Sequence, residues 1–251
     1  MHENSFLCRK NNKNNAGMIF IYLCEWKVMK KILYLALLAV ATKCFATGMV
    51  PETSVLLVDA QKGEASMNVK NTDSQPALLY TNIVDLPDSD KSIRLIVSQP
   101  VVRVDAGETQ RMRFLLQTSK PIKYEELKRV TFEGIPPKEK GKDKVALTIR
   151  QDLPVVIHPA GLPEETQPWK FLTWNKKDDG LVINNPSDYV VRITASFKTL
   201  PSGKSGVLDK TYILPHTSIK TILQNFSDNK VEFYPASRYG YKGDRFTTDL
   251  K

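Results

Sequence analysis

Apolar and polar residues alternate most clearly in residues 143–159 of the chain. Val145, Leu147 and Ile149 are each separated by one residue, so an extended strand places their side chains on one face. The residues just before them, Pro136-Pro-Lys-Glu-Lys-Gly-Lys-Asp-Lys144, carry prolines, a glycine and charges, which predicts a long loop. A strand that leaves such a loop could belong to its own core or could lend its apolar side chains to another protein. The alternation alone is typical of both.

Short strand patterns continue through the rest of the chain, with turn residues every eight to twelve positions and hardly any helical period. This rhythm is typical of antiparallel β-sandwiches. In the first half, the candidate strands lie at residues 54–70 (two strands around a Gln-Lys-Gly turn), 77–84, 93–97, 101–104, 110–116 and 130–135, and the 143–157 segment completes them.

The strand rhythm begins again after His158-Pro-Ala-Gly-Leu-Pro163, which contains two prolines and a glycine. We therefore expect an all-β protein with one domain at residues 47–157, a linker at 158–163 and a second domain at 164–251. In the second half, the candidate strands are residues 171–174, 181–184, 189–197, 210–214 and 218–223.

Residues 29–46 have the pattern of a signal peptide. Two lysines follow Met29, an apolar run comes next, and the small residues Cys44 and Ala46 stand at the spacing that signal peptidase requires. We expect cleavage after Ala46 and export of the rest of the chain. The apolar run is shorter than the ~20 residues of a membrane-spanning helix, so we expect no membrane insertion after cleavage. Residues 1–28 fit neither a signal peptide nor a domain; either translation starts at Met29, or these residues are a long leader extension.

Composition indicates a folded chain, with 41% hydrophobic and 25% charged residues. The formal net charge is +9, but residues 1–46 hold seven Lys or Arg and two acidic residues, a net of +5. The remaining +4 is spread along residues 47–251, without the tight basic cluster and interleaved aromatic residues of a nucleic-acid site. We expect no nucleic-acid partner.

The sequence offers little for catalysis. The three cysteines, Cys8, Cys24 and Cys44, all precede the expected cut, so the exported chain has no disulfide, thiolate nucleophile or cysteine metal site. Its two histidines, His158 and His216, have no partner at metal-ligand spacing, and we interpret both as solvated turn residues. No nucleophile motif, phosphate-binding loop or metal-binding motif occurs. We expect no enzyme activity, no catalytic residues and no metal.

Four motifs, in order, resemble those of one family. They are Gln99-Pro-Val-Val-Arg-Val-Asp-Ala-Gly107 with Arg111-Met-Arg-Phe114, Glu133-Gly-Ile-Pro-Pro137, Val155-Val-Ile-His-Pro-Ala-Gly-Leu162 and Ile183-Asn-Asn-Pro-Ser-Asp-Tyr-Val-Val191. Together with the signal peptide and the two disulfide-free β halves, they are similar to the periplasmic chaperones of pilus assembly, the PapD-like family. The resemblance covers essentially the whole exported chain.

The resemblance implies two immunoglobulin-like β-sandwich domains in tandem, in a boomerang-like arrangement. It also implies a periplasmic chaperone that binds and caps pilus subunits by donor-strand complementation and delivers them to an outer-membrane usher, without any cofactor. By the resemblance, Val145, Leu147 and Ile149 are the donor residues that enter the subunit. The alternative is a secreted two-domain adhesin or binding module without a chaperone role.

The chain departs from the family where members carry a basic pair that binds the subunit's terminal carboxylate. Ser54 and Pro154 stand at those two positions. Arg150 lies on the same side of the strand as residue 154 and is a possible replacement, with a solvated surface arginine as the other interpretation. Since Pro154 has no backbone N–H, we expect a bulge or an open sheet edge there.

A second departure concerns ion pairs. By the resemblance, Arg103 and Glu125 form a structural pair. Arg238 stands where the family usually has Asp, so any ion pair between the domains must use different partners. Asp244 is a possible replacement for that Asp.

Overall fold

The computed structural model describes residues 48–137, 148–177 and 179–251. Thr47–Lys251 form one compact unit. The expected leader segments 1–28 and 29–46, and the donor residues Val145 and Leu147, lie outside the described residues. No helix among the described residues is long and apolar enough to cross a membrane.

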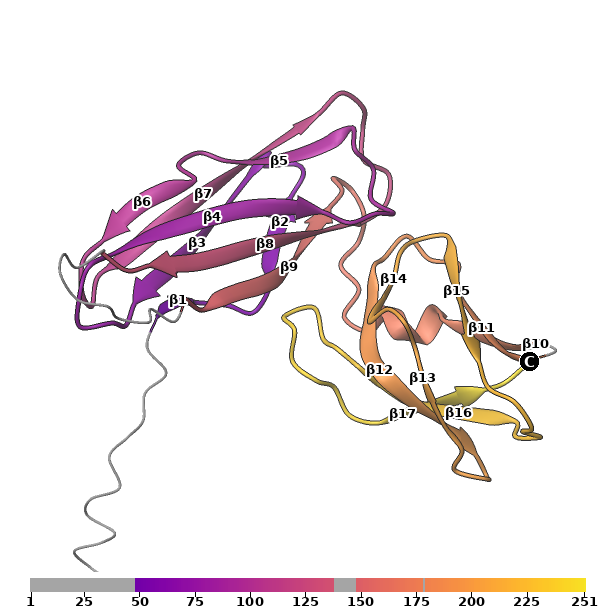
Figure 1. Ribbon diagram of the computed structural model, residues 1–251. Coiled ribbons are helices and arrows are strands. Elements are labelled where there is room, and N and C mark those ends of the chain that lie inside the picture. Colours follow the sequence, from indigo (N-terminus) through magenta and orange to yellow (C-terminus); the bar gives the residue numbers. More distant parts are fainter. Residues whose placement is uncertain (1–47, 138–147, 178) are drawn as a thin grey trace, which may run out of the picture. The chain divides into compact units, whose positions relative to one another are not determined.

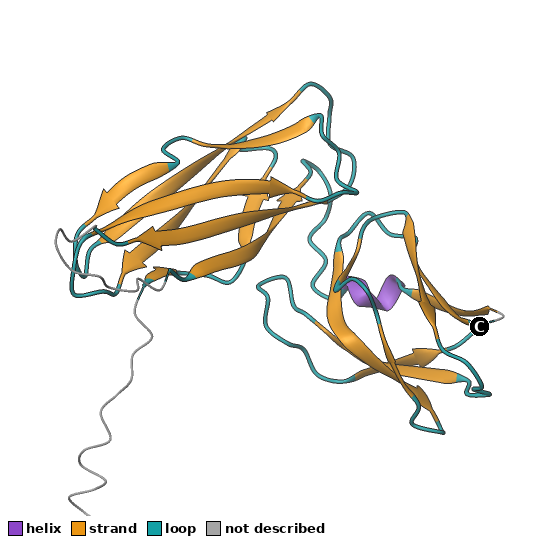
Figure 2. Cartoon of the chain, in the orientation of Figure 1, coloured by secondary structure: helices purple, strands orange, loops and turns teal. Residues whose placement is uncertain are grey.

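The first half is a nine-stranded sheet (Figures 1 and 2). Strand order is β5-β7-β3-β2-β9-β8-β4-β6, and β1 also pairs with β3. The strands are β1 (Met49–Pro51), β2 (Leu56–Asp59), β3 (Glu64–Asn71), β4 (Ala77–Asp85), β5 (Ile93–Val97), β6 (Val101–Val104), β7 (Thr109–Thr118), β8 (Glu126–Ile135) and β9 (Arg150–His158).

This sheet folds over at β2, which pairs with β3 through one residue pair and with β9 in parallel through four. Buried side chains from both sets of strands meet in one core, with Phe114 from β7 and Phe132 from β8 among the fully buried ones. The alternation of period two along each strand produces this core, because every second side chain turns inward.

The second half contains a three-stranded sheet, β10-β11-β15, and a five-stranded sheet built on β12 (Figure 2). Trp174 lies in the core between them, with its ring centroid 5.3 Å from that of Phe233 and 5.4 Å from that of Phe197. The elements are η1 (Pro168–Phe171), β10 (Thr173–Lys177), β11 (Gly180–Asn185), β12 (Val191–Leu200), β13 (Ser205–Val207), β14 (Tyr212–Ile213), β15 (Thr217–Ile222), β16 (Lys230–Pro235) and β17 (Phe246–Asp249).

The expected all-β class is confirmed, with η1 as a single 3₁₀ turn among the described residues. The expected strand at 171–174 is partly wrong, because Phe171 ends η1 and the strand starts at Thr173. Pro168 explains the difference, since its fixed φ favours the start of a helical turn. The strands β1, β13, β16 and β17 had no counterpart among the expected ones.

Candidate functional site

A row of apolar side chains runs along β9 and leaves the first core at its N-terminal end. Ile157 and Val155 are fully buried in that core, and Leu153 packs against it. Ile149 comes just before β9 on the same side, by strand parity, and is 47% exposed. The row therefore passes from the interior of the sandwich into solvent at one of the three expected donor residues.

The N-terminal part of β9 has one open edge. On one side β9 pairs with β8 without a register shift, from Arg150 opposite Glu133 to Ile157 opposite Glu126. On the other side its pairing with β2 begins only at Val155. Pro154 therefore lies where the second partner ends, which agrees with the expected edge and not with the alternative of a bulge.

Arg150, the possible carboxylate anchor, is bound to an acid of its own chain. Its Nε and one Nη lie 2.8 Å from Oε2 of Glu133, the residue opposite it on β8. The Arg150 side chain is 62% exposed. Any incoming carboxylate must compete with Glu133 for this guanidinium.

Ser54 is bound to a loop of the second half. Its hydroxyl donates to the carbonyl oxygen of Tyr239 at 2.7 Å. The next residue, Gly240, has φ +87°, and a Cβ there would lie 2.7 Å from Ser54 Oγ and 2.9 Å from Val55 Cγ2. The loop between β16 and β17 thus packs closely on the position where the family carries its first basic residue.

The expected pairing of Arg103 with Glu125 is wrong. Arg103 binds Asp105, with Nε at 3.1 Å and Nη2 at 3.0 Å from Oδ1, in an exposed pair on the surface. Glu125 is only 4% exposed and has other partners. Arg103 is on β6, whose pairing with β4 leaves its side chain on the outer face, so it does not reach the buried carboxylate.

Glu125 is the centre of a buried charge cluster that joins the two halves. Its Oε1 lies 2.9 Å from Nδ1 of His158 and accepts from Nη1 of Arg238 at 3.1 Å, and its Oε2 accepts the backbone N–H of Val190 at 3.0 Å. The ion pair between the halves is therefore formed by Arg238 and Glu125. The expectation that this pair uses different partners from those of the family agrees with the structure, but its acid is Glu125 and not Asp244.

His158 is not a solvated turn residue. Its side chain is 13% exposed, and its second ring nitrogen lies 2.9 Å from the carbonyl oxygen of Leu162. A carboxylate and a carbonyl oxygen are both acceptors, so both contacts are hydrogen bonds only when the imidazole carries two protons. His216, in contrast, is 51% exposed and contacts Asp188 at 2.7 Å.

A small apolar cluster lies beside the charge cluster. Leu127 of β8 and Val156 of β9 pack with Val55, Val190 and Leu214. Leu127 and Val156 are directly opposite each other in the β8–β9 ladder, on the face away from the first core. This cluster contains residues of both halves, so its apolar burial adds to the contacts that Glu125 makes between them.

Two arginines that were not expected from the sequence to be site residues border this apolar cluster. Arg129 lies two residues after Leu127 and directly opposite Pro154. Arg192 lies two residues after Val190, and its Nη2 donates to the carbonyl oxygens of Ser237 at 2.7 Å and Arg238 at 3.1 Å. Isolated arginines in strand patterns carry no signal of their own, so only the strand pairing reveals them.

Polar residues also enter the end of the first sandwich. Lys128 has a fully buried side chain whose Nζ lies 2.5 Å from Oδ1 of Asp85. Glu126 lies two residues before Lys128, on the same side of β8. Burial raises the pKa of the Glu126 carboxyl group. The charge of Asp90 raises this pKa further, whereas a hydrogen bond with the backbone of Asp90 lowers it. The ionised form of Glu126 is thus disfavoured by the fold.

We expect Glu126→Gln to stabilise the protein relative to wild type as pH rises. A carboxyl group whose pKa is raised by folding contributes stability that is present below its unfolded pKa, near 4.5, and lost as pH rises through the folded value. The amide of glutamine does not ionise, so the variant does not lose this stability as pH rises. Urea unfolding at a series of pH values from about 4 to 7 measures the difference, and exposed Glu108→Gln is the control. If the difference in the free energy of unfolding between wild type and variant is constant with pH, the raised pKa of Glu126 is contradicted.

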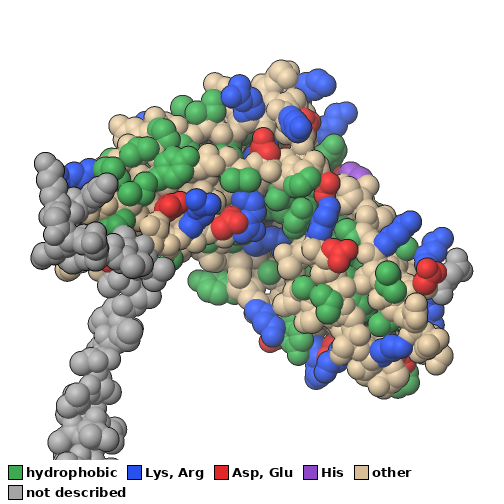
Figure 3. All heavy atoms as spheres, in the orientation of Figure 1, with side chains coloured by type: hydrophobic (Ala, Val, Ile, Leu, Met, Phe, Trp, Pro, Cys, Tyr) green, Lys and Arg blue, Asp and Glu red, His purple; other side chains and the backbone are tan. Residues whose placement is uncertain are grey.

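The outer face of the first half carries an exposed apolar patch over β4, β6 and β8 (Figure 3). Leu78 is 43% exposed, Val101 51% and Ile135 40%. Leu78 is opposite Ile135 in the ladder, and Val101 is opposite Tyr80 on the next strand. The patch lies on the outward side of the sheet, whereas Ile149 continues the inward row of β9.

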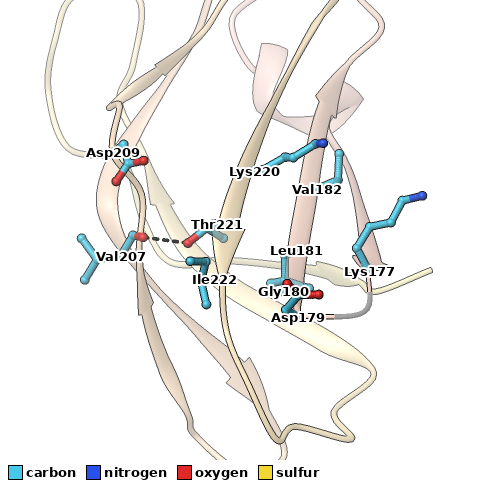
Figure 4. Close-up of a pocket in the computed structure, with 10 residues that line it drawn as sticks. All are labelled: Lys177, Asp179, Gly180, Leu181, Val182, Val207, Asp209, Lys220, Thr221 and Ile222. Atoms are coloured by element: carbon cyan, nitrogen blue, oxygen red, sulfur yellow. Dashed lines mark hydrogen bonds between the residues drawn. The ribbon is translucent and has the colours of Figure 1, made fainter.

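The second half has a cavity of about 630 Å³ that is lined by residues of β10, β11, β13 and β15 (Figure 4). Thr221 donates its hydroxyl to the carbonyl oxygen of Val207 there, at 2.8 Å. Val207 and Ile222 are 68% and 77% exposed, and the charged residues around them are two lysines and two aspartates. The cavity holds no histidine, and no group of three possible metal ligands occurs within the described parts of the chain.

Comparison with known proteins gives concordant results. Residues 48–163 match the family described as "Pili and flagellar-assembly chaperone, PapD N-terminal domain". The chain is 62% identical over 224 residues to a protein of Escherichia coli K12 named uncharacterized fimbrial chaperone YhcA, and the match covers 89% of this chain and 100% of that protein.

Solved structures share the fold at low sequence identity. The Salmonella enterica structure of the SafA pilin in complex with the SafB chaperone has a chain with TM-score 0.68 and 19% identity, covering 82% of this chain and 98% of its own length. The YadV chaperone matches with TM-score 0.65 and 20% identity, covering 80% of this chain and 99% of its own. These likenesses show the two-domain fold of such chaperones.

Proposed function

Because this chain belongs to the family of fimbrial chaperones, we propose that it binds and caps pilus subunits by donor-strand complementation and delivers them to an outer-membrane usher. The relatives are named as chaperones, and one fold neighbour is a chaperone solved with its pilin, which favours this role over that of an adhesin. We propose no catalytic activity and no cofactor.

The observation that carries the proposal is the exposed Ile149 at the end of a buried apolar row, beside the open edge of β9. By the resemblance, a subunit lacks one strand of its sandwich and exposes an apolar groove. A donated strand supplies main-chain hydrogen bonds through its edge and alternate side chains to the groove. Val145 and Leu147 would extend the row of Ile149 by the same parity.

Two neighbouring contacts support this geometry. The ladder between β8 and β9 holds the donor strand in one register on its closed side. The contacts of Glu125 hold His158, the last residue of β9, so that the strand is anchored at its C-terminal end. We propose that residues 47–157 and 164–251 are the two immunoglobulin-like domains, joined by the linker 158–163.

The outward patch of Leu78, Val101 and Ile135 supports a second partner. Exposed apolar patches on soluble proteins commonly mark interaction surfaces. Since the patch and Ile149 lie on opposite sides of the sheet, a bound subunit would leave the patch free. The patch would then be available for contact with the usher.

The family is periplasmic, and we propose that this chain is exported by residues 29–46 with cleavage after Ala46. The two lysines, the apolar run and the small residues before the cut support this processing. With this cleavage, residues 1–28 are removed together with the signal segment.

Expression of the whole chain together with a pilus subunit from the same gene cluster tests location and function at once. We expect the mature protein in the periplasmic fraction to begin at Thr47, as read by N-terminal sequencing. We expect soluble subunit to be recovered only when the chaperone is present. A mature protein that begins upstream of Thr47 would contradict the processing, and equal subunit recovery without the chaperone would contradict the function.

A further inference from the structure

The loop between β4 and β5, residues 86–92, contacts the second half at two points. Leu86 packs against the small apolar cluster that contains residues of both halves. Two residues later, the carboxylate of Asp88 accepts a hydrogen bond from Nζ of Lys210, which lies just before β14. This Nζ also lies 5.8 Å from the centre of the Tyr212 ring, and Tyr212 packs against the same apolar cluster. The loop therefore forms a bridge to the second half that is separate from the buried charge cluster.

The bridge is built on a compact turn. The backbone N–H of Ser89 donates to the carbonyl oxygen of Leu86 at 3.1 Å, and the Ser89 hydroxyl donates to the same oxygen at 2.9 Å. The carboxylate of Asp90 accepts the backbone N–H of Ser92 at 2.8 Å. Ser89 is only 7% exposed, so the turn is held at its centre as well. The contacts that fix Asp90 therefore also fix the position of Asp88.

Two buried ionisable side chains of β8 hold this turn from inside the first half. Lys128 has a fully buried side chain, and its Nζ lies 2.5 Å from Oδ1 of Asp85 and 3.5 Å from the backbone carbonyl oxygen of Asp90. Glu126 is 5% exposed, and its carboxyl group forms a hydrogen bond with the backbone of Asp90. Ionisable side chains are rarely buried in this way unless they have partners. Both of these side chains meet the loop at the same residue.

Glu126 is the group whose ionisation can act on the loop. The charged groups around it, from the loop, β4, β8 and the segment before β8, are Asp90, Asp85, Lys128 and Lys120. The ammonium of Lys128 already has the carboxylate of Asp85 as its partner. On β9, the residue opposite Glu126 is Ile157, which carries no charge. An ionised Glu126 would therefore be a buried carboxylate beside a second carboxylate, that of Asp90.

The direction of the pH effect follows from these surroundings. Burial raises the pKa of Glu126 most, and the charge of Asp90 raises it further, while the backbone bond and Lys128 oppose the increase. Opening of the loop exposes the carboxyl group to water and removes the cause of the increase. Stability of the closed loop is therefore fully present below the ordinary pKa, near 4.5, and is lost as pH rises through the raised value.

We propose that the 86–92 loop is a pH-dependent bridge between the two halves, which is closed while the Glu126 carboxyl group is protonated and opens when this group ionises. Opening separates Leu86 and Asp88 from the second half. The side chains of Asp88 and Lys210 are 44% and 39% exposed, so their pair alone adds little stability, and the buried groups decide whether the bridge is closed. The proposal concerns the free chain and does not depend on the chaperone function.

Hydrogen exchange of the exported chain, measured by mass spectrometry and divided by the intrinsic rate at each pH, tests the bridge. From about pH 5 to 8, we expect exchange of residues 86–92 and of residues 208–214 to rise together by at least about threefold. Glu126→Gln should keep exchange of both segments low at every pH, whereas exposed Glu108→Gln should behave as the wild type. Corrected exchange that does not depend on pH in the wild type, or that still depends on it in Glu126→Gln, would overturn the proposal.

A second variant tests whether the loop itself carries the effect to the second half. Leu86→Ala with Asp88→Asn removes both contact points and leaves Glu126 in place. We expect exchange of residues 86–92 to remain dependent on pH, and exchange of residues 208–214 to become independent of it. If residues 208–214 keep the dependence of the wild type, the effect reaches them by another route and the bridge is overturned.

An internal control distinguishes local opening from unfolding of the whole second half. The strand β11 (Gly180–Asn185) pairs with β10 and β15, away from β14. We expect its corrected exchange to stay constant over the same pH range in the wild type. A rise in β11 equal to that of residues 208–214 would mean that the whole second half unfolds, and it would also overturn the proposal.

Discussion

Replacement of Leu147 and Ile149 by glutamate should abolish the recovery of a co-expressed pilus subunit. Each side chain of this size contributes ~1.5–3 kcal/mol when fully buried, and a glutamate in an apolar groove adds the cost of a desolvated charge. The loss of both residues therefore weakens binding by at least about 100-fold. Affinity purification of the chaperone from periplasmic extracts, with the subunit quantified on the same gel, measures the effect.

A matched control is Ile222→Glu, because Ile222 is also an exposed isoleucine but lies on the edge strand β15 of the second half. We expect this variant to recover subunit as the wild type does. The thermal stability of the donor variant should also be close to wild type, since Ile149 is 47% exposed in the free chain. Unchanged subunit recovery by the double variant would rule out strand donation at these residues.

Glu125→Gln should cause a large loss of stability, about 3–5 kcal/mol in the free energy of unfolding. The amide leaves Arg238, which is 13% exposed, without its close carboxylate, and it also weakens the contacts to His158 and Val190. Urea unfolding of the exported chain measures the loss. A lower transition midpoint with an unchanged slope would show a loss of stability without a change in the surface that unfolding exposes.

A double-mutant cycle separates the Glu125–Arg238 interaction from the other contacts. We expect Glu125→Gln and Arg238→Met together to cost clearly less than the sum of the single changes, because the second change removes the unpaired charge. Arg103→Gln is the control: its pair with Asp105 is 67% and 64% exposed, so its loss should cost no more than about 1 kcal/mol. Additive losses at Glu125 and Arg238 would mean that the pair is not coupled.

Most strands of the first half could be predicted from the sequence because their apolar residues alternate. The expected strands at residues 77–84 and 93–97 correspond to β4 and β5. β8 begins earlier than its expected strand, at Glu126, because Glu126 and Lys128 occupy inward positions and interrupt the apolar pattern. A lysine is buried there only because Asp85, on the neighbouring strand, lies within reach of its Nζ.

The site was predictable only in its local part. Strand parity predicts that Val145, Leu147 and Ile149 share one face, and the missing N–H of Pro154 predicts a bulge or an open edge, of which the structure has the edge. The buried position of His158 and the pairing of Glu125 with Arg238 were not predictable. Glu125 and Arg238 are 113 residues apart in sequence, and no local pattern encodes which charges meet across such a distance.

The sequence by itself therefore determined the all-β class, the alternation of Val145, Leu147 and Ile149 and the membership in a chaperone family, because periodicity and short ordered motifs are properties of neighbouring residues. Only the tertiary structure decided which charges become partners. It paired Glu125 with Arg238 and His158, and it exposed Ile149 at the end of a buried row. The reason is physical: burial and long-range contacts set the energy of a charge, and they exist only after the strands have paired.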